Sequence, residues 1–319
     1  MTVKKFNYFR FISFIVVLIL IVVGIIIGVK TIKKKIDYTK TDEYLLINYG
    51  FNEEDAKYIT KNLDKNDVNK LLKMEYNPSY IYFIKQKYFI LENIEKYVEY
   101  KRDNISIEYS EVISIINTES NIDWIDNEKE TDTSKNELML VNRLYGLPKD
   151  YEVEDIVPVP VKYAYDGNKL SNIVLDNLIE LIEAGKEVGY TFVVSGSYRS
   201  YSEQEKLYNY YVNSSGRSEA DKIVARPGHS EYETGLSFDL VPYNKSYENP
   251  KSSDENKWLR ENAYKYGFIF RFDKDKEKLT GFGEYPWRLR YVGKKAAKII
   301  FDEKLCFEEY YAYYVRGNK

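Results

Sequence analysis

The residues best suited to chemistry lie between Ala225 and Leu240, in the segment ARPGHSEYETGLSFDL. A Pro-Gly turn opens the segment, and an apolar run carrying one acid, Asp239, closes it. Proteins commonly build metal or substrate sites from such a turn followed by a strand. The segment also contains His229, the single histidine among 319 residues. Because a catalytic zinc needs about three protein ligands, commonly two or three of them histidines, this count argues against a zinc centre.

The composition is that of a globular protein with room for two domains: 44% of the residues are hydrophobic and 30% are charged. The formal net charge is −3, and acids are mixed with lysines throughout the chain. This pattern predicts no nucleic-acid partner. The single cysteine, Cys306, excludes an intrachain disulfide and a multi-cysteine zinc site.

Residues 11–29, FISFIVVLILIVVGIIIGV, carry no charge. At ~1.5 Å per residue a helix of this length spans roughly 28 Å, close to the hydrocarbon thickness of a bilayer. The run leads straight into lysines, without the small residues of a cleavage site, so an uncleaved membrane-spanning helix is predicted. Basic residues flank both ends, and the positive-inside rule therefore does not decide the orientation.

Residues 30–135 are predicted to form a helical spacer. Short helices are expected between Thr41 and Leu72, with start signals at Asp42 and Asn52. One longer helix or a pair of helices is expected over residues 79–102. This region carries no catalytic motif, which leaves a passive stalk or a small recognition module as its role.

Residues 136–319 mix helices and strands without a regular βαβ period. Strands are predicted at 138–141, 157–163, 190–194, 238–241 and 285–292. Helices are predicted at 172–184, 202–212 and 255–266. This order favours an α+β domain with a largely antiparallel sheet and flanking helices, and it disfavours a doubly wound nucleotide-binding fold.

Three segments of this region carry a family resemblance. They are SGSYRSYSEQEKLY at 195–208, ARPGHSEYETGLSFDLV at 225–241, and WLRENAYKYGFIFRFDKDKEKLTGFGEYPWRLRYVG at 258–293. In order and spacing they resemble the VanY-type D-alanyl-D-alanine carboxypeptidases, zinc peptidases of bacterial cell-wall metabolism with a hedgehog-like fold. The resemblance covers about residues 136–319. It implies a wall-facing domain, and therefore a cytoplasmic tail at residues 1–10.

The resemblance also shows which catalytic positions differ. The family motif S-E-H-Q-T-G-L-A-x-D supplies a zinc histidine and a zinc aspartate; here these positions hold Tyr232 and Asp239. The family motif E-P-W-H supplies the general base and the third ligand; here they are Tyr285 and Arg288. Of the ligand set only Asp239 is retained, and His229 is not a ligand by register. We therefore predict no catalytic residue and no bound cofactor, with Arg288 pairing with Asp239 in place of zinc.

Two alternatives would preserve some chemistry. Glu284, one place before Tyr285, would replace the base only if a bulge turned it to the same face of the strand. A carboxylate site made from Asp239, Glu231 and Glu233 would bind a hard cation weakly and would activate water less than zinc does.

The positions that the family uses to grip its substrate are retained. Arg199, Gln204 and Ser230 match pocket residues, and an arginine fork suits a carboxylate. Each residue also has a structural interpretation: an ion pair for Arg199, a solvated helix position for Gln204 and a turn cap for Ser230.

The resulting prediction is a membrane-anchored, wall-facing pseudopeptidase with its C-terminal domain outside the cytoplasm. Its partner would be the D-Ala-D-Ala end of a peptidoglycan stem peptide, or a cell-wall enzyme. The alternatives are an active D,D-carboxypeptidase that trims the terminal D-Ala with an altered metal site, and a structural scaffold.

Overall fold

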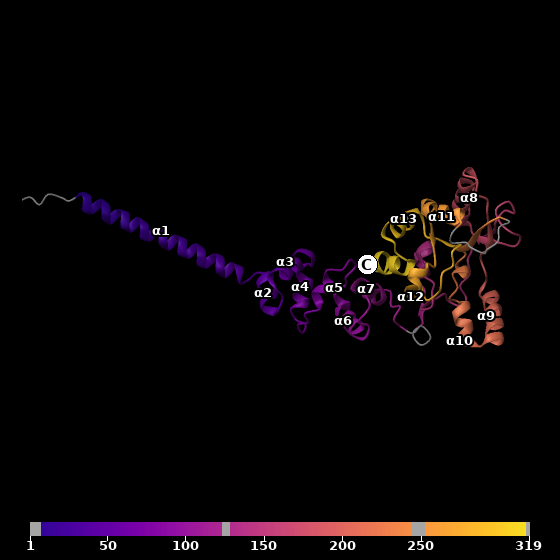
Figure 1. Cartoon of the computed structure of the whole chain (residues 1–319), viewed down its shortest axis with the longest axis horizontal. Coiled ribbons are helices and arrows are strands. Elements are labelled where there is room, and N and C mark those ends of the chain that lie inside the picture. The colour runs from indigo at the N-terminus through magenta and orange to yellow at the C-terminus, as the bar shows by residue number, and fades with distance from the viewer. Residues whose placement is uncertain (1–7, 123–127, 244–252, 317–319) are drawn as a thin grey trace, which may run out of the picture. The chain divides into compact units, whose positions relative to one another are not determined.

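The structure is a computed structural model, which describes residues 8–122, 128–243 and 253–316 (Figure 1). Contacts between Cα atoms divide the chain into two compact units, Met1–Asp103 and Asn104–Lys319. Residues 1–7 of the predicted tail lie outside the described residues, and residues 8–10 belong to the first helix. Residues 104–135, which the sequence pattern placed with the spacer, belong by contacts to the second unit.

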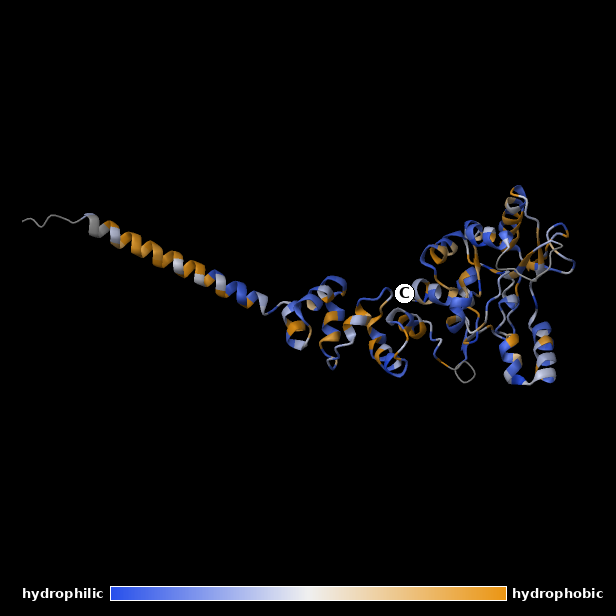
Figure 2. Ribbon diagram, in the orientation of Figure 1, coloured by the Kyte–Doolittle hydropathy of each residue, from blue (hydrophilic) through white to orange (hydrophobic). Residues whose placement is uncertain are grey.

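The first unit begins with helix α1 (Tyr8–Tyr38), which is apolar along most of its length (Figure 2). It contains the predicted span at residues 11–29 and extends nine residues beyond it. From Ile12 onward it is long and apolar enough to cross a membrane, a property that it shares with N-terminal signal sequences.

Short helices follow: α2 (Asp42–Tyr49), α3 (Glu53–Asn62), α4 (Lys65–Leu71), α5 (Tyr80–Ile84), the 3₁₀ turn η1 (Leu91–Asn93) and α6 (Ile94–Asp103). Asn52 caps α3 as predicted, since its side chain accepts the Asp55 N–H. The cap of α2 is Thr41, one residue before the predicted Asp42, and its side chain accepts the Tyr44 N–H. Residues 79–102 thus form separate helices.

The second unit contains a four-stranded antiparallel sheet. Its order is β5 (Phe192–Gly196), β6 (Ser237–Pro242), β8 (Arg288–Tyr291) and β7 (Phe268–Phe270). Two smaller pairs accompany it: β1 (Lys129–Glu130) with β2 (Tyr145–Gly146), and β3 (Ile156–Pro158) with β4 (Lys169–Ser171). The α+β class with a largely antiparallel sheet is confirmed.

Helices surround this sheet. They are α7 (Tyr109–Asn117), α8 (Asn172–Glu187), α9 (Tyr201–Ser215), α10 (Arg217–Ile223), α11 (Asp254–Asn262), α12 (Glu277–Thr280), α13 (Lys294–Glu303) and α14 (Phe307–Tyr310). The shorter elements are the 3₁₀ helices η2 (Thr133–Leu138), η3 (Glu231–Thr234), η5 (Ala263–Tyr266) and η6 (Lys274–Lys276), and the short π-helix η7 (Tyr311–Val315). Figure 1 shows α9 and α10 side by side, and they pack against each other. The main core joins α8 to the sheet through Leu178, Leu181, Phe192 and Phe238.

Several predicted elements differ from the structure. The strand predicted at 157–163 ends at Pro158, and the strand predicted at 285–292 begins only at Arg288. Residues 138–141 form no strand, because arginine side chains take their carbonyls: Arg290 donates to Met139 O at 2.9 Å, and Arg271 donates to Val141 O at 3.3 Å. Helix α8 continues past Gly185, where a Cβ atom would lie 2.7 Å from the Phe192 ring. Gly185 therefore provides room for packing within the helix and does not end it.

Helix α7 explains why residues 104–135 belong to the second unit. Its Ser114 hydroxyl donates to Glu309 of α14 at 2.7 Å. Just after the helix, Glu119 accepts from Lys129 at 2.7 Å, from Tyr145 at 2.9 Å and from Arg316 at 2.8 Å. These contacts connect α7 and the residues after it to β2 and to the C-terminal residues of the second unit.

Candidate functional site

The loop at residues 225–235 is fixed at both ends of its 3₁₀ turn. Ser230 caps η3 by accepting the Tyr232 N–H at 3.4 Å, and its own N–H donates to Glu233 at 3.2 Å. Gly235 ends the turn at φ +70, where an added Cβ would lie 2.8 Å from Ile156. The Gly228 N–H also donates to both oxygens of Glu233, at 3.0 Å each. Tyr232 is therefore held in one orientation by its own loop.

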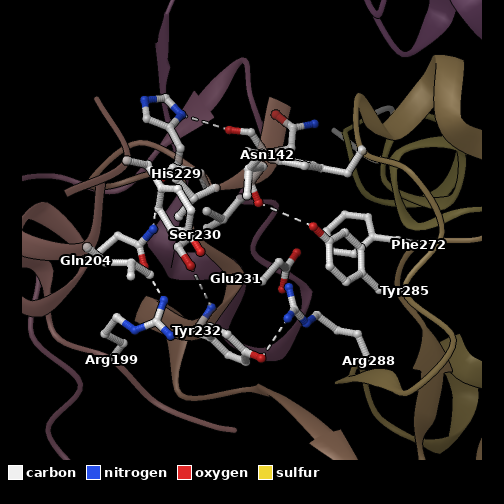
Figure 3. Close-up of a pocket in the computed structure, with 17 residues that line it drawn as sticks. Asn142, Arg199, Gln204, His229, Ser230, Glu231, Tyr232, Phe272, Tyr285 and Arg288 are labelled. Carbon is white, nitrogen blue, oxygen red and sulfur yellow. Dashed lines mark hydrogen bonds between the residues drawn. The ribbon is translucent and has the colours of Figure 1, made fainter. Parts of the chain in front are cut away.

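Tyr232, Asp239 and Arg288 form one interlocked cluster (Figure 3 shows the Tyr232–Arg288 contact). The Tyr232 hydroxyl donates to Asp239 Oδ2 at 2.7 Å, and Arg288 Nε donates to Asp239 Oδ1 at 2.9 Å. Arg288 Nη2 contacts the Tyr232 oxygen at 2.7 Å and Asp239 Oδ2 at 3.2 Å. The predicted pairing of Arg288 with Asp239 is confirmed.

Burial and neighbouring charges together set the protonation states in this cluster. Burial alone would lower the pKa of Arg288, but the Asp239 carboxylate raises it above its usual value. Burial raises the pKa of the Tyr232 phenol; the Arg288 charge opposes this rise, and Asp239 adds to it, so that the pKa stays above its usual value. Tyr232 therefore stays a neutral hydrogen-bond donor, and Arg288 stays a cation.

Arg199 and Gln204 lie on the other side of Tyr232. Gln204 is buried; its amide oxygen accepts from Arg199 Nη1 at 2.7 Å, and its nitrogen donates to Ala225 O at 2.6 Å. The Arg199 guanidinium lies 5.0 Å from the centre of the Tyr232 ring. Gln204 is thus a buried positioning residue, which contradicts its interpretation as a solvated helix residue. Within the described part of the chain, no carboxylate pairs with Arg199.

His229 and Tyr285 have structural contacts. His229 is buried, with Nδ1 at 2.8 Å from Asn142 O and Nε2 at 2.9 Å from Glu128. The Tyr285 hydroxyl donates to Ile223 O at 3.3 Å, and its ring lies 4.7 Å from the Arg288 guanidinium. Tyr285 therefore links α10 to the segment that precedes β8.

Glu231 is the acid of a buried charge network. It accepts from Arg271 Nε at 2.6 Å and from Arg290 Nη1, while Arg271 also binds Glu308 at 2.7 Å. Burial alone would raise the pKa of Glu231, but the two guanidinium charges hold it below its usual value. Burial raises the pKa of Glu233 to about 7 despite its backbone N–H donors and the nearby Arg199 charge.

These residues surround a cavity of about 200 Å³. Its polar lining includes Asn142, Arg199, Gln204, Ser230, Tyr232, Tyr285 and Arg288. Its apolar lining includes Leu207, Tyr211, Ile223, Val224, Phe272 and Phe282. The structure thus brings together the three predicted substrate residues and three of the four positions that were predicted from the resemblance to match the family's catalytic residues. The apolar side of the cavity was not predicted. The one signal for it in the sequence is the apolar pair Ile223 and Val224, which directly precedes the loop.

Zinc does not fit the side chains at these positions. Asp239 offers lone pairs, but Arg288 presents N–H groups and Tyr232 donates its hydroxyl proton to Asp239. Across residues 8–122, 128–243 and 253–316, no group of three or more His, Cys, Asp or Glu side chains is arranged to hold a metal ion. Glu284, the alternative candidate for the base, lies with its Oε1 atom 3.7 Å from Nη2 of Arg260.

Comparison with known proteins now identifies the domain. The VanY family, described as D-alanyl-D-alanine carboxypeptidase, matches residues 167–294. The putative carboxypeptidase YodJ of Bacillus subtilis is 39% identical over 184 residues, covering 56% of this chain and 67% of YodJ. This chain belongs to the VanY family. The resemblance predicted from its motifs is confirmed.

Solved structures agree. The LdcB LD-carboxypeptidase, whose structure is described as revealing the molecular basis of peptidoglycan recognition, aligns with a TM-score of 0.56 and 37% identity. The alignment covers 59% of this chain and 91% of LdcB. A variant of the vancomycin-resistance D,D-pentapeptidase VanY, solved with Zn(II), is 32% identical, with a TM-score of 0.47, and covers 55% of this chain and 98% of that one.

The Glu231 network gives a stability prediction. Glu231→Gln removes the charge that Arg271 and Arg290 share, and it should lower the free energy of unfolding by about 3–5 kcal/mol. The control is Glu180→Gln, which breaks an exposed pair with Lys294 and should cost less than about 1 kcal/mol. Urea unfolding followed by tryptophan fluorescence measures both, since all three tryptophans lie in residues 104–319. Equal effects would show that the network does not hold the loop.

Proposed function

We propose that this protein is a non-hydrolytic member of the VanY family that binds peptidoglycan stem peptides through the cavity around Tyr232. The proposal rests mainly on the Tyr232–Asp239–Arg288 cluster. Two of the family's three zinc-ligand positions donate hydrogen bonds to the third, and the position of the general base holds Tyr285. A guanidinium remains protonated and repels a dication. The cluster therefore supports binding without zinc-dependent hydrolysis.

The location proposed for this activity follows from α1 and from the family. Helix α1 would anchor the chain as a single membrane span, with residues 104–319 on the outer side, facing the wall. Stem peptides ending in D-Ala-D-Ala are found there, and so are cell-wall enzymes, which are the alternative partner.

Metal content and hydrolysis test the proposal directly. We expect the full-length protein, purified in detergent with added zinc, to contain far less than one zinc per chain. It should release no D-Ala from a pentapeptide ending in D-Ala-D-Ala, but should bind that peptide in calorimetry. Stoichiometric zinc together with D-Ala release would support an active carboxypeptidase instead. Absence of binding would support a scaffold.

The retained arginine provides a second test. Arg199→Ala should weaken binding of the same pentapeptide about tenfold or more, the usual contribution of a charge-assisted hydrogen bond. Arg217→Ala, an exposed arginine on α10, is the control and should leave the affinity unchanged. Unchanged binding in Arg199→Ala would show that the peptide does not occupy this cavity.

Restoring the family residues tests whether these positions alone account for the loss of chemistry. The triple variant Tyr232→His, Tyr285→Glu, Arg288→His supplies two histidines beside Asp239 and a carboxylate base. We expect it to bind about one zinc per chain and to release D-Ala measurably above the parent. If a folded triple variant takes up no zinc, other parts of the cavity also prevent metal binding.

A further inference from the structure

The cavity carries more positive than negative charge. Arg199 and Arg288 both line it, with their guanidinium carbons 5.0 Å and 4.3 Å from the centre of the Tyr232 ring (Figure 3). Asp239 balances one of these charges through Arg288. The partner of Arg199 is the neutral amide of Gln204. Glu231 also lines the cavity, but its charge is shared with two buried arginines.

Both guanidinium groups retain unused donors. Arg288 uses Nε and Nη2 on Asp239 and Tyr232, and Arg199 uses Nη1 on Gln204. Among the described residues, no acceptor binds Nη1 of Arg288 or Nη2 of Arg199. Neither of these nitrogens is among the fully buried side-chain atoms that lack a partner. They are therefore accessible to a ligand.

The surrounding groups hold these guanidiniums in place. Arg288 is fixed by three hydrogen bonds within the cluster, and Gln204 is in turn fixed by Ala225 O. A side chain that is already ordered loses little conformational entropy when it binds a ligand. The apolar wall at Leu207 and Val224 lies in the same cavity, so its roughly 200 Å³ combine a cationic side with an apolar side. This combination fits a small apolar residue with a free carboxylate.

We propose that Arg288, which occupies a metal-ligand position of the family, binds the terminal carboxylate of the peptide together with Arg199. This inference rests on the proposed function, because it names the group of the peptide that the cavity recognises. Each guanidinium has a free N–H group with which it can donate a charge-assisted hydrogen bond to a carboxylate oxygen in this cavity. Arg288 is thus a ligand-binding residue as well as the partner of Asp239.

Calorimetry with two versions of one peptide tests this role. The probe is a pentapeptide ending in D-Ala-D-Ala, used as the free acid and as the C-terminal amide, with the full-length protein. The parent should bind the acid at least about tenfold more tightly than the amide. Arg288→Gln should reduce this preference to about threefold or less, because it weakens binding of the acid more than binding of the amide. Arg288→Lys, which keeps the charge, should restore part of the preference.

The matched control is Arg260→Gln. Arg260 is also half-buried, pairs with Asp273 at 2.7 Å and stacks on Phe270, but it lies outside this cavity. It should leave the ratio of acid to amide affinity unchanged, and circular dichroism verifies that each variant is folded. Equal binding of acid and amide by the parent would overturn the carboxylate inference and leave the proposed function intact. A preference that Arg288→Gln does not alter would assign recognition to Arg199 alone. If neither peptide binds, the proposed function itself is wrong.

Discussion

The arrangement of the site depends on one buried carboxylate, that of Glu231, held between Arg271 and Arg290. Arg290 lies on β8, opposite Ile269 of the edge strand β7, and Arg271 directly follows β7. Both arginines donate to Glu231. Burying a single charge is costly, and burying it against two hydrogen-bonded counter-charges fixes its position. Glu231 therefore places the η3 turn against the sheet, and its neighbour Tyr232 against the cavity.

Strand register then determines what Tyr232 meets. Asp239 on β6 lies directly opposite Arg288 on β8 in the antiparallel ladder. Side chains at such positions have Cβ atoms ~5 Å apart, so an acid and an arginine there form a pair with little backbone adjustment. Tyr232 reaches the same carboxylate from the loop. The two donors thus converge on Asp239 because the sheet and the loop bring these three positions together.

The sequence predicted the features that depend on local chemistry or on register. Asn52 as a helix cap, the antiparallel sheet and the Arg288–Asp239 pair all follow from neighbouring residues or from motif alignment. Residues 138–141 have the apolar pattern of a strand, but arginines from distant segments take their carbonyls. The burial of Gln204 and the buried contacts of His229 have the same origin. Each depends on a partner more than 20 residues away, which residue pattern alone does not identify.

The Arg288–Asp239 pair meets one electrostatic requirement of this fold. Asp239 is only about one-quarter exposed and needs a positive partner, which Arg288 supplies without any change in strand register. A metal accepts lone pairs and polarises water, whereas a guanidinium only donates hydrogen bonds and keeps its proton. Arg288 therefore balances the charge of Asp239, and it adds hydrogen-bond donors to the cavity.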